Sequence, residues 1–243
     1  MDPLIWLVPC VLLAATIGGV VGFGTGILML PLLGAAFGLR EAVPMLGIAM
    51  LFANASRAAF SWREIDWRVV GAQSLGAIPF AVLGASVFAG VHAQYLGAVV
   101  GCALLVMVPL RHLAEAKSVR IRLRHLPFVG AITGMLSAVG GATGPVSTPF
   151  LLNMGLVRGS YLGTDGVSSL FAGLAKTGGY AMQGVLPSHA WTYGVPLGAF
   201  MVGGSFIGRR LVDRLSSERF TKIVEAAVLA VAVFLIATSV VQY

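Results

Sequence analysis

Residues 25–33 read TGILMLPLL, and residues 143–151 read TGPVSTPFL. Both stretches contain Thr-Gly, four further residues, Pro, one residue and Leu, and their first residues, 25 and 143, are 118 positions apart. The same offset, give or take one residue, places Arg57 of the first copy beside Lys176 of the second. An internal duplication explains both matches, because self-similarity at a fixed spacing indicates repeated structural units.

The composition around these stretches is that of a membrane protein. Of 243 residues, 58% are hydrophobic and 10% are charged, whereas soluble domains average about 25% charged residues. A helix needs ~20 apolar residues to cross a bilayer core. We therefore expect an all-α integral membrane protein with eight apolar segments, at about residues 4–38, 41–60, 69–90, 93–110, 127–155, 159–184, 191–208 and 220–241.

The eight segments form two groups of four, separated by a polar stretch. Residues 111–125 read RHLAEAKSVRIRLRH and are the longest polar interruption in the chain. We predict a first membrane repeat at residues 1–110, a cytoplasmic linker at 111–126 and a second membrane repeat at 127–243. Each half is expected to hold a broken helix followed by three spans.

The first and fifth segments are too long for one span, and small residues interrupt them. Gly22–Gly26 reads GFGTG and Gly140–Gly144 reads GGATG, compositions that break a helix. Irregular backbone at membrane depth is tolerated only where protein buries it or where it lines a wet cavity. Two breaks at matching positions therefore predict a functional site.

The positive-inside rule favours a particular course for the broken segments. If all eight segments cross the membrane, the fourteen Lys and Arg residues outside the spans divide seven to seven between the two sides. If the first and fifth are re-entrant hairpins, thirteen lie on one side and Arg40 alone on the other. We therefore predict hairpins and an inverted repeat; the alternative, in which Leu4–Val21 spans by itself, stays open.

After each break a half-helix is expected to begin, at Gly26 and at Gly144. The first N–H groups of a helix have no intrahelical acceptor and carry the positive end of its dipole. If the two breaks face each other, both N-termini converge on one site that suits a small oxyanion. The candidate binding residues there are Thr25, Gly26, Thr143, Gly144, Ser147 and Thr148.

Three further polar residues lie inside spans. A cation at membrane depth is costly and by default functional, so Lys176 and Arg57 are candidates to attract the anion. The alternatives are a structural ion pair for Lys176 and a snorkelling interfacial anchor for Arg57. Asn54, one turn before Arg57, offers an amide to the same site or joins helices.

Asp165 is the fourth polar residue of interest. It lies eleven residues before Lys176, on the same helix face but ~16 Å away by helical rise, which excludes a direct bond between them. Asp165 could pair with Arg57, cap a helix or carry a proton in coupled transport. We keep it as the candidate coupling residue.

Other classes of function find no support in the sequence. Cys10 and Cys102 lie in apolar segments, where cysteine usually packs as a small hydrophobic residue, so we predict no disulfide and no metal. No span pairs His, Cys, Asp or Glu as catalysis requires, and no nucleic-acid-binding signature occurs. We expect no enzymatic activity, no cofactor and no nucleic-acid partner.

The order and spacing of these motifs resemble the sulfite exporter TauE/SafE family of membrane permeases. The resemblance covers about residues 5–237 and includes both broken segments, the turn Arg63–Arg68 (REIDWR) and residues 199–210. It implies a multi-pass secondary carrier in the inner (cytoplasmic) membrane for a small anion such as sulfite or an organosulfonate. An anion channel, or a carrier of another small solute, is the alternative, and a homodimer stays open.

Overall fold

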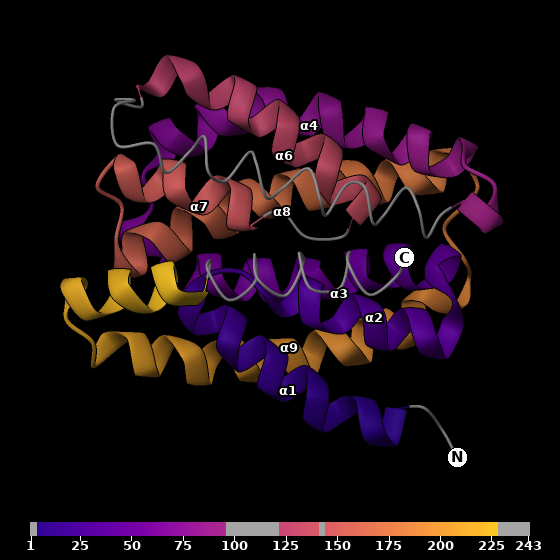
Figure 1. The fold of residues 1–243 in the computed structure, drawn as a ribbon, viewed down its shortest axis with the longest axis horizontal. Coiled ribbons are helices and arrows are strands. Elements are labelled where there is room, and N and C mark those ends of the chain that lie inside the picture. Colours follow the sequence, from indigo (N-terminus) through magenta and orange to yellow (C-terminus); the bar gives the residue numbers. More distant parts are fainter. Residues whose placement is uncertain (1–3, 96–121, 141–143, 228–243) are drawn as a thin grey trace.

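The computed structural model describes residues 4–95, 122–140 and 144–227, and within these ranges it contains helices and no strand (Figure 1). Residues 96–110 of the fourth apolar segment, most of the linker, Thr143 and residues 228–241 of the eighth segment lie outside the described residues. The helices are α1 (Leu4–Val21), α2 (Thr25–Phe37), α3 (Leu39–Phe60), α4 (Trp67–Gly90), α6 (Leu126–Gly140), α7 (Gly144–Asn153), α8 (Arg158–Met182) and α9 (His189–Asp213), with short 3-10 turns η1 (Trp62–Glu64), η2 (Ala93–Tyr95) and η3 (Leu123–His125), and residues 217–227 are also helical.

Both long apolar segments are broken within their glycine-rich stretches. The first divides into α1 and α2, and the second into α6 and α7. Gly22 and Gly24 have φ angles of 89° and 101°, a region that residues with a Cβ atom rarely adopt. The chain therefore reverses direction after α1 because glycine occupies these two positions.

We name the two ends of the bundle after an arginine that forms hydrogen bonds at each. At one, called the Arg40 end, Arg40 donates to the Val91 carbonyl oxygen at 2.6 Å, and the His189 ring lies 2.9 Å from the Glu41 carboxylate. At the other, called the Arg209 end, Arg209 donates to the Glu64 carboxylate at 2.6 Å. The described loop cations at the Arg209 end are Arg63, Arg68, Arg122, Arg124, Arg158, Arg209, Arg210, Arg214, Arg219 and Lys222.

Corresponding helices of the two halves run in opposite directions (Figure 1). Helices α1, α3, α7 and α9 run from the Arg40 end toward the Arg209 end, whereas α2, α4, α6 and α8 run the other way. Thus α1 opposes α6, α2 opposes α7, α3 opposes α8 and α4 opposes α9.

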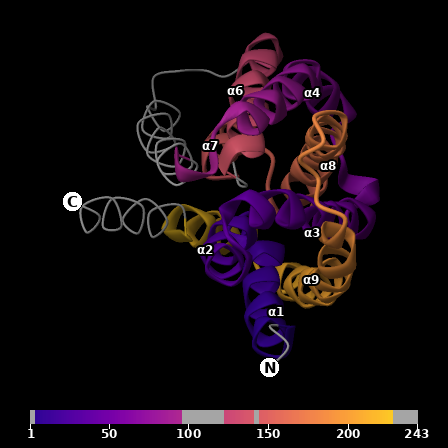
Figure 2. The same ribbon diagram turned by 90° about the vertical axis from the view of Figure 1, so that its right-hand side faces the viewer.

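Helix packing crosses the boundary between the halves. The most extensive contacts join α4 with α6 and α1 with α9, and small residues permit them: the backbone of Gly19 lies against Ser205 and Gly208, and that of Gly76 against Pro127. Figure 2 shows the result as two layers, with α1, α2, α3 and α9 in one and α4, α6, α7 and α8 in the other. Helices α3 and α8 pack together where the layers meet.

The outer surface of the bundle is apolar. Helices α3 and α4 have 22 and 24 residues, about 33 and 36 Å of helix, and both are apolar and long enough to cross a bilayer. On α4, the side of Gly76 and Gly84 packs against α6, while Leu75 is 73% exposed and Leu83 is 51% exposed. Large apolar groups outside and small residues between helices are typical of membrane proteins.

The packing on α4 predicts different effects for two glycines of the same helix. A Cβ atom at Gly76 would lie 1.8 Å from the Pro127 carbonyl oxygen, whereas a Cβ atom at Gly71 meets nothing within 4 Å. We expect Gly76→Ala to destabilise the protein by about 1–3 kcal/mol through overpacking, and Gly71→Ala to be neutral or slightly stabilising. Thermal unfolding in detergent measures both, and equal unfolding temperatures would contradict the packing of α4 on α6.

Candidate functional site

A buried cavity lies where the two broken segments meet α3, α4 and α8. Its volume is about 60 Å³, and one water molecule needs roughly 10–15 Å³ of such space. The cavity can therefore hold several water molecules or one small solute. Its walls come from both halves of the sequence, because Gly22–Gly24 and Gly144 belong to different breaks.

The two breaks touch each other at this cavity. A Cβ atom on Gly144 would lie 1.9 Å from the Phe23 Cβ atom, so the start of α7 rests directly on the first break. No side chain caps the N-terminus of α2, and Gly24 and Gly26 line the cavity. The positive ends of two helix dipoles thus meet at one buried space, an arrangement that favours an anion.

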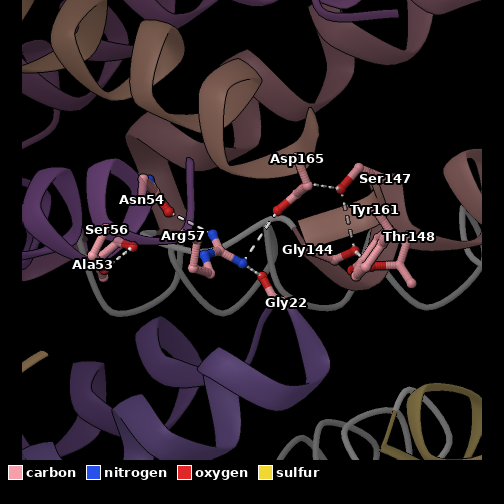
Figure 3. Close-up of polar contacts among 10 residues, drawn as sticks. All are labelled: Gly22, Ala53, Asn54, Ser56, Arg57, Gly144, Ser147, Thr148, Tyr161 and Asp165. Atoms are coloured by element: carbon pink, nitrogen blue, oxygen red, sulfur yellow. Dashed lines mark hydrogen bonds and ion pairs between the residues drawn. The ribbon is translucent and has the colours of Figure 1, made fainter. Parts of the chain in front are cut away.

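Arg57 reaches this cavity from α3. Its guanidinium donates hydrogen bonds to the Gly22 carbonyl oxygen and, at 2.5 Å, to Asn54 Oδ1, and its Nη1 atom lies 3.4 Å from Asp165 Oδ2 (Figure 3). Only 6% of Arg57 is exposed. The alternative of a snorkelling anchor is therefore wrong, because the guanidinium points inward to partners that satisfy it.

Asp165 lies well inside α8, so it caps no helix. It is 2% exposed and forms the ion pair with Arg57, while Ser147 Oγ on α7 donates to its other oxygen at 3.3 Å. The pair therefore joins α3, α7, α8 and the first break through one set of contacts. It also neutralises the charge of Arg57 inside the protein.

Lys176 is buried, and the described residues give it no counter-charge. It is 4% exposed, and its Nζ atom donates to the Ser137 carbonyl oxygen at 3.1 Å. No carboxylate among the described residues lies within ion-pair distance, so this part of the chain offers no partner for the structural ion pair considered for Lys176. An ammonium has three donors, and the carbonyl takes one, which leaves the others to the cavity that Lys176 lines.

Arg57 and Lys176 make corresponding contacts in the two halves. Each binds a backbone carbonyl near the C-terminal end of the first broken helix of its own half: Gly22 just after α1, and Ser137 in the last turn of α6. Carbonyl groups at the end of a helix lack an intrahelical hydrogen-bond donor and carry the negative end of the helix dipole. A cation bound to such a carbonyl is therefore stabilising. The match observed between positions 57 and 176 in the sequence thus extends to their contacts.

The structure gathers most of the predicted residues at the cavity. The described residues that line it include Gly26, Asn54, Arg57, Gly144, Ser147, Asp165 and Lys176. The Asn54 side-chain oxygen accepts a hydrogen bond from Arg57. The amide nitrogen of Asn54, which is a donor, therefore remains to bind a solute. Thr143 lies outside the described residues.

Two predicted hydroxyls point elsewhere, which corrects their assignment to the cavity wall. Thr25 Oγ1 donates to the Ala14 carbonyl oxygen at 3.1 Å. Thr148 Oγ1 donates to the Gly144 carbonyl oxygen at 2.5 Å and lies 2.7 Å from the Tyr161 hydroxyl. Neither residue lines the cavity, because a buried hydroxyl pairs with the nearest backbone or side-chain partner.

The cavity also contains polar residues that the sequence reasoning missed. Gln73 on α4 and Ser168 on α8 line it and are 4% and 1% exposed, and no described residue bonds Gln73 Oε1 or Ser168 Oγ. The helical period could have predicted Ser168, because residues three or four positions apart lie on one helix face and Ser168 follows Asp165 by three positions. On α8 that face comprises Asp165, Ser168, Ser169, Ala172, Gly173 and Lys176.

The ion pair predicts a stability difference between two carboxylates. Asp165→Asn leaves the Arg57 charge buried without compensation, and breaking a buried pair in this way costs about 3–5 kcal/mol. Glu218→Gln removes an exposed pair with Lys222, whose side chains are 71% and 78% exposed, and should change stability little. Thermal unfolding in detergent compares them; an Asp165→Asn protein as stable as Glu218→Gln would refute the pairing.

Comparison with known proteins identifies the family. The family model described as sulfite exporter TauE/SafE matches residues 7–235. No curated protein and no solved structure matches the chain. The match includes both helix breaks and every residue that lines the cavity. The chain therefore belongs to the sulfite exporter TauE/SafE family and is a membrane transporter.

Proposed function

We propose that this protein is a secondary transporter that carries a small anion, of the sulfite or organosulfonate type, across the cytoplasmic membrane. The observation that carries the proposal is the buried Lys176 ammonium, which has no counter-charge among the described residues and lines the cavity between the two helix breaks. A cation kept at membrane depth is costly, and an anionic solute would neutralise it.

The helix termini support the same proposal. The N-termini of α2 and α7 add positive potential at the cavity, and the glycines at these N-termini, Gly24, Gly26 and Gly144, line it. Charges interact more strongly in a buried site than in water. The cavity, at about 60 Å³, suits a compact solute of a few heavy atoms.

The proposed topology is an inverted repeat with a hairpin in each half. Two observations support it: corresponding helices run in opposite directions (Figure 1), and ten of the eleven described loop cations lie at the Arg209 end. By the positive-inside rule the Arg209 end is then cytoplasmic. The α1–α2 hairpin would open toward the outer side and the α6–α7 hairpin toward the cytoplasm.

Alternating access would follow from movement of the two layers seen in Figure 2. Each layer combines helices of both halves, because α1 packs on α9 and α4 packs on α6. Helices α3 and α8 carry Arg57, Asp165 and Lys176 where the layers meet. Movement at this contact would expose the cavity to one side of the membrane and then to the other.

Transport should depend on Lys176. In proteoliposomes loaded with sulfite, we expect saturable counterflow of labelled sulfite, and we expect Lys176→Gln to reduce it at least about tenfold, since a buried charge interaction exceeds 1.4 kcal/mol. Lys222→Gln is the matched control, because this lysine lies in an exposed pair at the Arg209 end. Sulfoacetate, taurine, sulfate and chloride are tested as competitors.

Two outcomes would count against the proposal. Full counterflow in Lys176→Gln would remove the observation that carries it. Sulfite flux without counterflow or saturation would indicate a channel instead of a carrier.

The hairpins can be tested by cysteine labelling. In a background without Cys10 and Cys102, we expect cysteines at Arg124 and Arg158 to react with an impermeant reagent from the same side, and a cysteine at Gln94 from the opposite side. If the α6–α7 segment crosses the membrane, Arg124 and Arg158 will be labelled from opposite sides.

A further inference from the structure

Three ionisable residues are found among the described residues that line the cavity: Arg57, Asp165 and Lys176. Arg57 and Asp165 form an ion pair with 3.4 Å between Nη1 and Oδ2, so their charges compensate each other. Lys176 bonds only to the Ser137 carbonyl oxygen, which is neutral. The residues between α6 and α7, at 141–143, are Gly, Ala and Thr and add no charge.

The described part of the cavity wall therefore carries one uncompensated positive charge. A singly charged anion beside Lys176 would make the buried site neutral. A doubly charged anion would leave its second negative charge to the partial charges of the two helix N-termini, in surroundings of low polarity where an incompletely paired charge is disfavoured. The charge of the solute, in addition to its size, should decide whether it enters.

Neutral polar groups in the cavity wall cannot neutralise a second negative charge on the solute, but they can form hydrogen bonds with it. Gln73 and Ser168 lie in the cavity wall, each with a buried polar atom that no described residue bonds, and Asn54, whose oxygen accepts from Arg57, lines the same space. Buried polar groups without partners are rare in folded proteins. The Ser168 hydroxyl and the Asn54 amide nitrogen can donate to oxygen atoms of a solute, whereas Gln73 Oε1 only accepts and would bind a hydroxyl of the solute.

We infer that the site selects singly charged oxyanions, such as hydrogensulfite or an alkanesulfonate, over doubly charged ones such as sulfate or a disulfonate. Lys176 supplies the single neutralising charge, and Ser168 and Asn54 donate hydrogen bonds to the oxygen atoms of the solute. This inference rests on the proposed function, and it specifies the charge state of the solute that the same cavity takes.

Methanesulfonate and sulfate test the inference directly, because they have similar size and tetrahedral shape but carry one and two negative charges at neutral pH. Each competes against labelled sulfite in the counterflow assay. We expect methanesulfonate to reach half-inhibition at a concentration at least about tenfold lower than sulfate. Equal or stronger inhibition by sulfate, with sulfite counterflow intact, would overturn the inference alone. Absence of all anion exchange would overturn the proposed function and the inference with it.

Variants of Gln73 test the cause of the selection. Gln73→Lys adds a second cation to the wall and should shift the ratio of the two half-inhibitory concentrations toward sulfate at least about tenfold. Gln73→Met, of similar length and without charge, should keep the wild-type preference for methanesulfonate. An unchanged ratio in Gln73→Lys would refute charge selection.

If Gln73→Lys does not fold, the same ratio is measured in Asp165→Asn. Like Gln73→Lys, this variant raises the net charge of the cavity by one, here by removing a negative charge from α8. The ratio should again shift toward sulfate when the assay is performed at a temperature below unfolding of this variant. A ratio equal to that of the wild type would refute the inference.

Discussion

The buried ion pair between Arg57 and Asp165 is the interaction on which the rest of the site depends. Both side chains are almost fully buried, and isolated charges at that depth would be strongly destabilising. Together with the Gly22 carbonyl and Ser147, the pair fixes α3, α7 and α8 against the first helix break. Because these two charges neutralise each other, Lys176 is the one uncompensated positive charge among the described residues of the cavity wall.

The helix breaks make such a site possible within an apolar bundle. Breaking a helix exposes carbonyl groups on one side of the break and N–H groups on the other. Arg57 and Lys176 bind the carbonyl ends, at Gly22 and Ser137, while the N-H ends of α2 and α7 border the cavity. One arrangement thus satisfies the backbone at membrane depth and creates a positive space for a solute.

Local sequence patterns predicted those parts of the site that depend on the backbone. The glycine-rich stretches located both breaks, and the apolar surroundings of Lys176 indicated its burial. Partners and side-chain directions depend on tertiary contacts: the pairing of Asp165 with Arg57 was one of three alternatives that the sequence left open, and the bond of Thr25 to Ala14, away from the cavity, was not expected. Gln73 was missed because its place in the cavity wall depends on the packing of α4 on α6, where the Gln73 backbone lies against Gly130, and local patterns do not contain this contact.

Direct binding tests the central claim that Lys176 neutralises a buried anion. Isothermal titration of the detergent-purified protein with sulfite should give saturable binding in the wild type and in the exposed-site control Lys222→Gln, and no detectable binding in Lys176→Gln. Sulfite binding of wild-type affinity in Lys176→Gln would contradict the account, because the cavity would then bind an anion without its uncompensated cation.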